Sequence, residues 1–121
     1  MGAKKYPIRL RYKATVAADG TGYVRSEILH RNRVIACQSI GFRNRTGARG
    51  TVEAYIKQGA ARTFIFDQGT PAANRWYWYP YTQFIKEGEQ IEIQQASCSA
   101  DDVLDLHIVG YTIFGPEALV E

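Results

Sequence analysis

Histidine and cysteine are common acid–base and nucleophilic residues near neutral pH, and this 121-residue chain holds only two of each. His30 falls in a polar stretch, and His107 alternates with leucine and isoleucine, so we expect it on the outer side of a strand. Cys37 and Cys98 have neither zinc-motif nor CxxC spacing, and no GxSxG, HExxH or P-loop pattern is present. We therefore expect no enzyme and no cofactor. We also expect reduced thiols, with a disulfide as the alternative.

An acidic turn is the candidate for a metal site. Asp101, Asp102 and Asp105 could offer several oxygen ligands to a hard cation such as calcium. The stretch lacks the glycine and the ligand spacing of a known calcium loop, so solvated turn carboxylates are the better interpretation. We expect no metal there.

The run from Arg75 to Tyr81 is the most unusual feature of the sequence. On a strand, Trp76 and Trp78 share one face while Tyr77 and Tyr79 share the other, and only one pair can fill the core. Large rings with polar tips are favoured at interfaces, because they bury much area at a small entropic cost. The outer pair is therefore expected to meet another subunit or a sugar, or to be covered by a loop of the same chain.

Basic residues concentrate before Arg62 and acidic residues after it, although the net charge is only +3. An arginine-rich set could grip nucleic acid, but charge alone does not locate a continuous stripe. Arginine is also favoured at bidentate protein contacts, so a protein partner is the preferred interpretation and nucleic acid the weaker one. The set comprises Arg25, Arg31, Arg33, Arg43, Arg45 and Arg49.

The two ends of the sequence are expected to be arms outside the folded domain, over residues 1–7 and 116–121. The first is polar, and the second carries Leu119 and Val120 with no strand pattern around them. No apolar run approaches 18 residues and the N-terminus does not resemble a secretory signal, so we expect synthesis in the cytosol and no membrane partner.

Strand periodicity dominates residues 8–115, which we expect to form one domain. Apolar residues alternate strictly from Ile8 to Val16, and a strand over residues 34–43 would place Val34, Ala36, Ile40 and Phe42 on one face. Glu87-Gly88-Glu89 is typical of a hairpin turn before the alternating residues 90–95. Eight or nine short strands and no convincing helix predict an all-β, antiparallel β-sandwich of the jelly-roll type, with a closed barrel harder to separate.

The second half of the chain resembles small jelly-roll proteins in the virions of tailed bacteriophages. Three elements carry the resemblance: the aromatic strand Arg75–Tyr79, the segment Phe84–Ile93, and the strand Leu104–Tyr111. That family implies a homotrimeric cement or decoration protein on the outside of a capsid, made in the host cytoplasm and bound to the major capsid protein. A carbohydrate-binding or receptor-binding tail domain is the alternative, and a nucleic-acid-binding β-barrel the second.

The residues that we expect at an interface come from the aromatic run, the arginine set and the two ends. They are Trp76, Tyr77, Trp78, Tyr79, Tyr81, Arg43, Arg45, Arg49, Lys4, Lys5, Tyr6, Leu119 and Val120.

Overall fold

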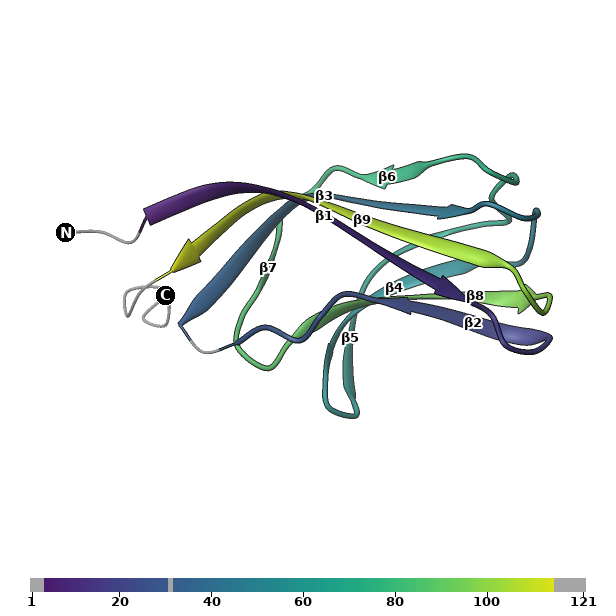
Figure 1. Ribbon diagram of the computed structural model, residues 1–121, viewed down its shortest axis with the longest axis horizontal. Helices are drawn as coiled ribbons and strands as arrows, with labels where there is room; N and C mark the ends of the chain where they lie inside the picture. The colour runs from purple at the N-terminus through teal and green to yellow at the C-terminus, as the bar shows by residue number, and fades with distance from the viewer. Residues whose placement is uncertain (1–3, 31, 115–121) are drawn as a thin grey trace.

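The computed structural model describes residues 4–30 and 32–114, which form nine β-strands in two antiparallel sheets packed face to face (Figure 1). Sheet A comprises β1 (Lys4–Thr15), β9 (Val103–Phe114), β3 (Arg33–Asn44), β6 (Tyr77–Tyr79) and β7 (Gln83–Ile85). Sheet B comprises β2 (Gly20–Arg25), β8 (Gln90–Cys98), β4 (Val52–Gln58) and β5 (Ala61–Gln68).

The order of the strands defines the fold. Sheet A runs β1-β9-β3-β6, with β7 also paired to β3, and sheet B runs β2-β8-β4-β5. Apart from the adjacent strands β4 and β5, successive segments cross between two four-stranded layers, with β6 and β7 acting as two parts of one edge strand. This is the double Greek-key arrangement of a jelly roll, so the predicted fold class is confirmed. Among the described residues no helix is long and apolar enough to span a membrane.

The core lies between the sheets and follows the period of two that the sequence predicts. Ile8, Leu10, Tyr12 and Ala14 of β1 pack against it, while the residues between them are exposed. The largest fully buried apolar side chains fill the centre: Phe42, Ile35, Ile40, Ile85, Ile91, Ile93, Leu104, Leu106 and Ile108.

A β-bulge in β3 corrects the expected alternation of that strand. The register between β3 and β9 shifts between Cys37 and Ser39, so one extra residue reverses which side chains face inward. Ile35 and Cys37 join the core before the bulge, and Ile40 and Phe42 after it. The expectation that Val34 and Ala36 share a face with Ile40 is therefore wrong.

The connection from sheet A to sheet B also differs from expectation. The aromatic strand is shorter than predicted, and Pro80 ends β6 because proline cannot donate a ladder hydrogen bond. The short strand β7, which the sequence did not indicate, pairs with β3, whereas β8 lies in the other sheet. The turn at Glu87-Gly88-Glu89 is thus a crossover between layers rather than the turn of a hairpin.

The first strand begins earlier than predicted. Residues 4–7 belong to β1, where Lys4 pairs with Phe114 and Pro7 with Tyr111, so they are not a separate arm. β1 is an edge strand, the position in a sheet where proline is tolerated. Residues 116–121, including Leu119 and Val120, lie outside the described part of the chain.

Candidate binding surfaces

The two tryptophans of the aromatic run lie on the outer face of sheet A. One row of paired residues crosses this face from Arg11 to His107, Gly41 and Trp78. The Trp78 indole covers Gly41 so closely that a Cβ there would lie 2.6 Å from the ring carbon Cζ3. A glycine inside a strand often marks such a close approach, and this was a signal available in the sequence. Trp78 nevertheless keeps 45% of its surface exposed.

Trp76 is held beside Trp78 by contacts on several sides. The two indoles stack with 5.6 Å between their ring centroids, and both rest against the His107 imidazole, at 5.9 Å from Trp76 and 5.4 Å from Trp78. The Arg43 guanidinium lies 4.6 Å from the Trp76 ring centroid and that of Arg11 lies 5.6 Å from it. We call Trp76, Trp78, His107 and Gly41 the tryptophan platform.

His107 points outward, as its position in the alternation predicted, but the indoles partly cover it. Burial lowers the pKa of the imidazole below its ordinary value, and the positive charges of Arg11 and Arg9 lower it further. The ring is therefore neutral at pH 7 and offers the indoles an uncharged partner.

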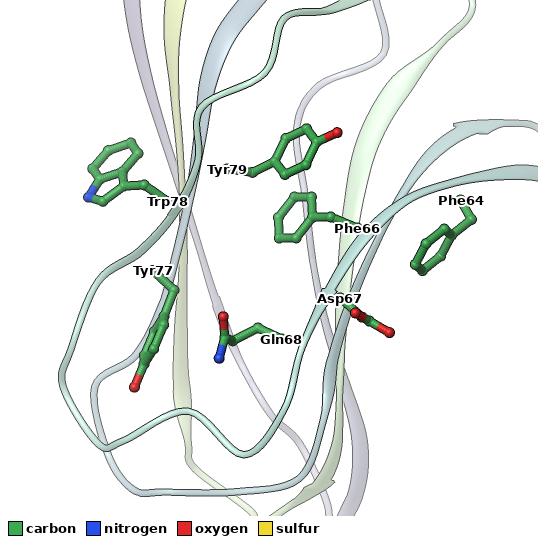
Figure 2. Close-up of a pocket in the computed structure, with 7 residues that line it drawn as sticks. All are labelled: Phe64, Phe66, Asp67, Gln68, Tyr77, Trp78 and Tyr79. Atoms are coloured by element: carbon green, nitrogen blue, oxygen red, sulfur yellow. The ribbon is translucent and has the colours of Figure 1, made fainter.

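Tyr79 points the opposite way from Trp78, toward Phe66 of β5, as Figure 2 shows. Tyr79 packs against the core and stacks flat on Phe66 of β5, with centroids 4.5 Å apart. The Tyr77 hydroxyl accepts a 2.8 Å hydrogen bond from the Ala72 amide. The tyrosine pair is thus the inner one and the tryptophan pair the outer one. The four rings are not all covered within the protomer.

A groove of about 290 Å³ separates β5 from β6, which are the edge strands of the two sheets on the same side of the sandwich. Its lining residues are Phe64, Phe66, Asp67, Gln68, Tyr77, Trp78 and Tyr79 (Figure 2). Phe64 is 53% exposed, and Tyr81, which packs against Tyr79 at 5.2 Å, is 66% exposed. We call Phe64, Phe66, Tyr77, Tyr79 and Tyr81 the aromatic edge.

The three arginines that we expect at an interface make ion pairs with buried carboxylates. Arg45 makes two hydrogen bonds to Asp105, of 2.6 and 2.8 Å, and Arg43 makes a third of 3.1 Å. Arg49 makes two to Asp102, of 2.8 and 3.0 Å. The expectation that Asp102 and Asp105 are solvated is therefore wrong, because both side chains are buried. Asp101 alone of the three is exposed.

These ion pairs lower the pKa of both carboxyl groups. The hydrogen bonds from Arg49 hold the pKa of Asp102 at about 2, against burial, which would raise it. For Asp105, burial raises the pKa, but the hydrogen bonds from Arg45 and Arg43 outweigh burial and leave it below its ordinary value. Asp102 also accepts hydrogen bonds from the Ser99 amide and the Asn44 side chain, so its oxygens are occupied. No group of three or more potential ligands able to hold a metal ion occurs within residues 4–30 and 32–114.

A third buried carboxylate lies on the outer face of sheet B, and no sequence pattern indicates it. Glu92 alternates with Ile91 and Ile93 as a solvent-facing residue would, yet it is fully buried. Arg25 and Arg62 cover it, with nitrogen–oxygen distances of 2.6 and 2.7 Å. The same two guanidinium groups lie over the Tyr23 ring. This cluster pairs one carboxylate with two guanidinium groups at the centre of that face.

The remaining candidates are dispersed. Both cysteines are free and buried, and burial raises the pKa of Cys37 to about 12. At the start of β1, the Lys5 ammonium lies 5.1 Å from the Tyr111 ring centroid, and Tyr6 is exposed. Lys5 and Tyr6 do not join the aromatic edge. They lie on β1, at the opposite edge of sheet A.

The geometry defines a jelly-roll β-sandwich with two exposed aromatic surfaces. No protein-family model matches the sequence, and no curated protein sequence does. Similar solved structures include infectious bursal disease virus, Gx strain (16% identity, 94% of this chain and 32% of that chain, TM-score 0.41). Another is an exo-β-1,3-galactanase from Phanerochaete chrysosporium with galactose (13%, 90% and 29%, TM-score 0.42). A third is Eiger TNF from S. frugiperda (10%, 84% and 92%, TM-score 0.31). The chain spans about a third of the length of the first two.

Proposed function

We propose that the chain is a virion structural protein: a capsid decoration protein that forms a homotrimer and binds the major capsid protein on the outside of a bacteriophage capsid. The observation that carries the proposal is the aromatic edge. Exposed rings lie at β5 and β6, the edge strands of the two sheets, and such surplus ring surface favours a protein contact. The resemblance of the second half of the chain to phage decoration proteins supplies the kind of partner.

The aromatic edge has the composition of an interface core. Phe66 and Tyr79 form a stacked base that is anchored in the hydrophobic core. Tyr81 packs against Tyr79 of this base, Phe64 packs against Tyr55, and both Tyr81 and Phe64 are exposed. Anchored aromatic side chains lose little conformational entropy on binding, which is why they dominate interface energetics. The arginines no longer contribute to the proposal, because Arg43, Arg45 and Arg49 serve intramolecular pairs.

The proposal includes a non-catalytic role. The Cys37 thiol, with a pKa of about 12, is almost wholly protonated at neutral pH and cannot act as a nucleophile. His107 is engaged by two indoles, and no hydrogen bond joins it to a carboxylate among the described residues. The buried carboxylates Asp102 and Asp105 accept hydrogen bonds from arginines, so neither is poised for proton transfer.

Sedimentation velocity at tens of micromolar tests the assembly. We expect a trimer for the wild type and a folded monomer for the double variant Phe64→Ser/Tyr81→Ser, because both exposed rings are lost while the core is kept. Ile28→Ser is the matched control, since Ile28 is an equally exposed apolar residue (55%) in the loop before β3. A monomeric wild type, or a double variant that remains trimeric, would contradict the proposal.

One observation favours a second candidate, a carbohydrate-binding domain. The groove between β5 and β6 is lined by Asp67 and Gln68 as well as by aromatic residues (Figure 2). Rings that can stack on a sugar, together with a few polar groups that fix its orientation, are the usual composition of a small-ligand site. Saturable binding on a glycan array that is lost in Asp67→Ala would support this candidate. If no glycan on the array is bound, the carbohydrate-binding candidate is contradicted and the assembly role stands as the proposal.

A further inference from the structure

The positive charge of the chain is gathered on one layer of the sandwich. The five strands of sheet A contain seven basic residues and one acidic residue, whereas the four strands of sheet B contain three of each. The one acidic residue of sheet A, Asp105, is already paired with Arg43 and Arg45. Arg33 is paired with Glu27, so the uncompensated positive charge of the outer face comes from the exposed basic residues of β1.

Four of the basic residues form a regular line. Lys5, Arg9, Arg11 and Lys13 of β1 are all exposed and alternate with residues that pack on the core. Alternate residues of a strand lie about 6.8 Å apart on the same face, so Arg9, Arg11 and Lys13 present evenly spaced cationic groups. We call these four residues the basic stripe. The sequence did not reveal it, because its members resemble the solvated face of any amphipathic strand.

The basic stripe is continuous with the tryptophan platform. Arg11 stands opposite His107 in the β1–β9 ladder, and its guanidinium reaches the Trp76 ring. Beyond it, the half-exposed indole of Trp78 lies over Gly41 in the same row. One face thus combines a line of cations with exposed aromatic rings a few strands away.

We propose that the outer face of sheet A binds single-stranded nucleic acid, with its phosphates along the basic stripe and a base stacked against Trp78. A cationic track beside stacking rings is the arrangement by which proteins hold unpaired strands without reading their sequence. An acidic peptide would use the charges but has no need of the indoles. Double-stranded nucleic acid offers no free base to stack. The inference does not rest on the proposed function, because the basic stripe lies on β1, at the opposite edge of sheet A from the aromatic edge.

Tryptophan fluorescence during titration with an unstructured oligothymidylate tests the proposal. We expect saturable quenching and an affinity that falls with salt. A strand that contacts Arg9, Arg11 and Lys13 gives a slope of about −2 in a plot of log affinity against log salt. Arg9→Gln/Lys13→Gln should make that slope shallower by about 1.4. Lys57→Gln/Lys86→Gln removes the same charge from β4 and the turn before β8, and should leave the slope unchanged.

Trp78→Leu tests the stacking contact separately. We expect binding to weaken by about 5- to 100-fold while the salt slope stays the same, because a stacked base is lost and the phosphate contacts remain. The charge variants still test the proposal if this variant does not fold. Absence of saturable binding at low salt overturns the proposal. The proposal is also overturned if the protein binds poly-glutamate or heparin as tightly as the oligothymidylate and if Trp78→Leu does not weaken binding of the oligothymidylate. If the wild type sediments as a monomer, the proposed trimer is refuted but the proposed nucleic-acid binding is not.

Discussion

Replacing Asp102 by asparagine should destabilise the protein in a way that depends on pH. The charged carboxylate is buried and receives two hydrogen bonds from Arg49 and one each from Asn44 and Ser99. Lowering its pKa from 3.8 to about 2 corresponds to about 2 kcal/mol of stability at neutral pH. Asparagine also turns an amide donor toward Arg49 or Ser99, so the expected loss at pH 7 is about 2–4 kcal/mol.

The pH dependence follows from the sign of the pKa shift. A carboxyl group whose pKa is lowered by folding stabilises the protein fully above its unfolded value, here 3.8, and the effect is lost as the pH falls through about 2. The gap in free energy of unfolding between wild type and Asp102→Asn should therefore be widest above pH 5 and narrow steadily below pH 4. Urea denaturation at several pH values measures it.

The neighbouring residue supplies a control for this experiment. Asp101 is exposed and has a φ of 72°, a left-handed conformation that asparagine adopts readily. Asp101→Asn should change the free energy of unfolding by less than about 0.5 kcal/mol at every pH. The reasoning is refuted if Asp102→Asn costs no more than this control at pH 7, or if its cost is the same at pH 3 as at pH 7.

Two further predictions concern packing. Gly41→Ala should displace the Trp78 indole, because its carbon Cζ3 would lie 2.6 Å from the new Cβ. We expect the free energy of unfolding to fall by about 1–3 kcal/mol and iodide to quench tryptophan emission more strongly. Ser39→Ala on the same strand should change neither quantity. The Cys37 thiol, fully buried and with a pKa of about 12, should react with a thiol reagent at pH 8 only as fast as the protein unfolds, and rapid labelling of the native protein would show that the β3–β9 region opens locally.

Residue patterning was sufficient to predict the class of fold, because each strand has one dry and one wet face. The alternation from Ile8 to Ala14 and the inward Ile91 and Ile93 appear in the structure as expected. The bulge at Gln38 was not predictable in the same way, since a single inserted residue reverses the faces without altering composition. The split between β6 and β7 has a visible cause in Pro80, but its consequence depends on the pairing with β3.

The candidate site was less predictable than the fold, because it is made by pairs of residues distant in sequence. Arg45 and Asp105 are separated by 60 positions and meet only through the register of β3 and β9. Glu92 is concealed by Arg25 and Arg62 from two other strands, which no local pattern could indicate. The position of the Trp78 indole depends on distant pairing as well, because Gly41 leaves room for the indole and meets Trp78 only through the register of β3 and β6.

The position of β9 has a consequence for how the protein is made. This strand lies between β1 and β3 in sheet A, although its residues are the last of the nine strands to be synthesised. A nascent chain that has already produced β1 and β3 therefore holds two amphipathic strands without the neighbour that joins them. Sheet A must close after translation has passed residue 103. During that interval the apolar faces of β1 and β3 need protection from aggregation with other nascent chains on the same messenger RNA.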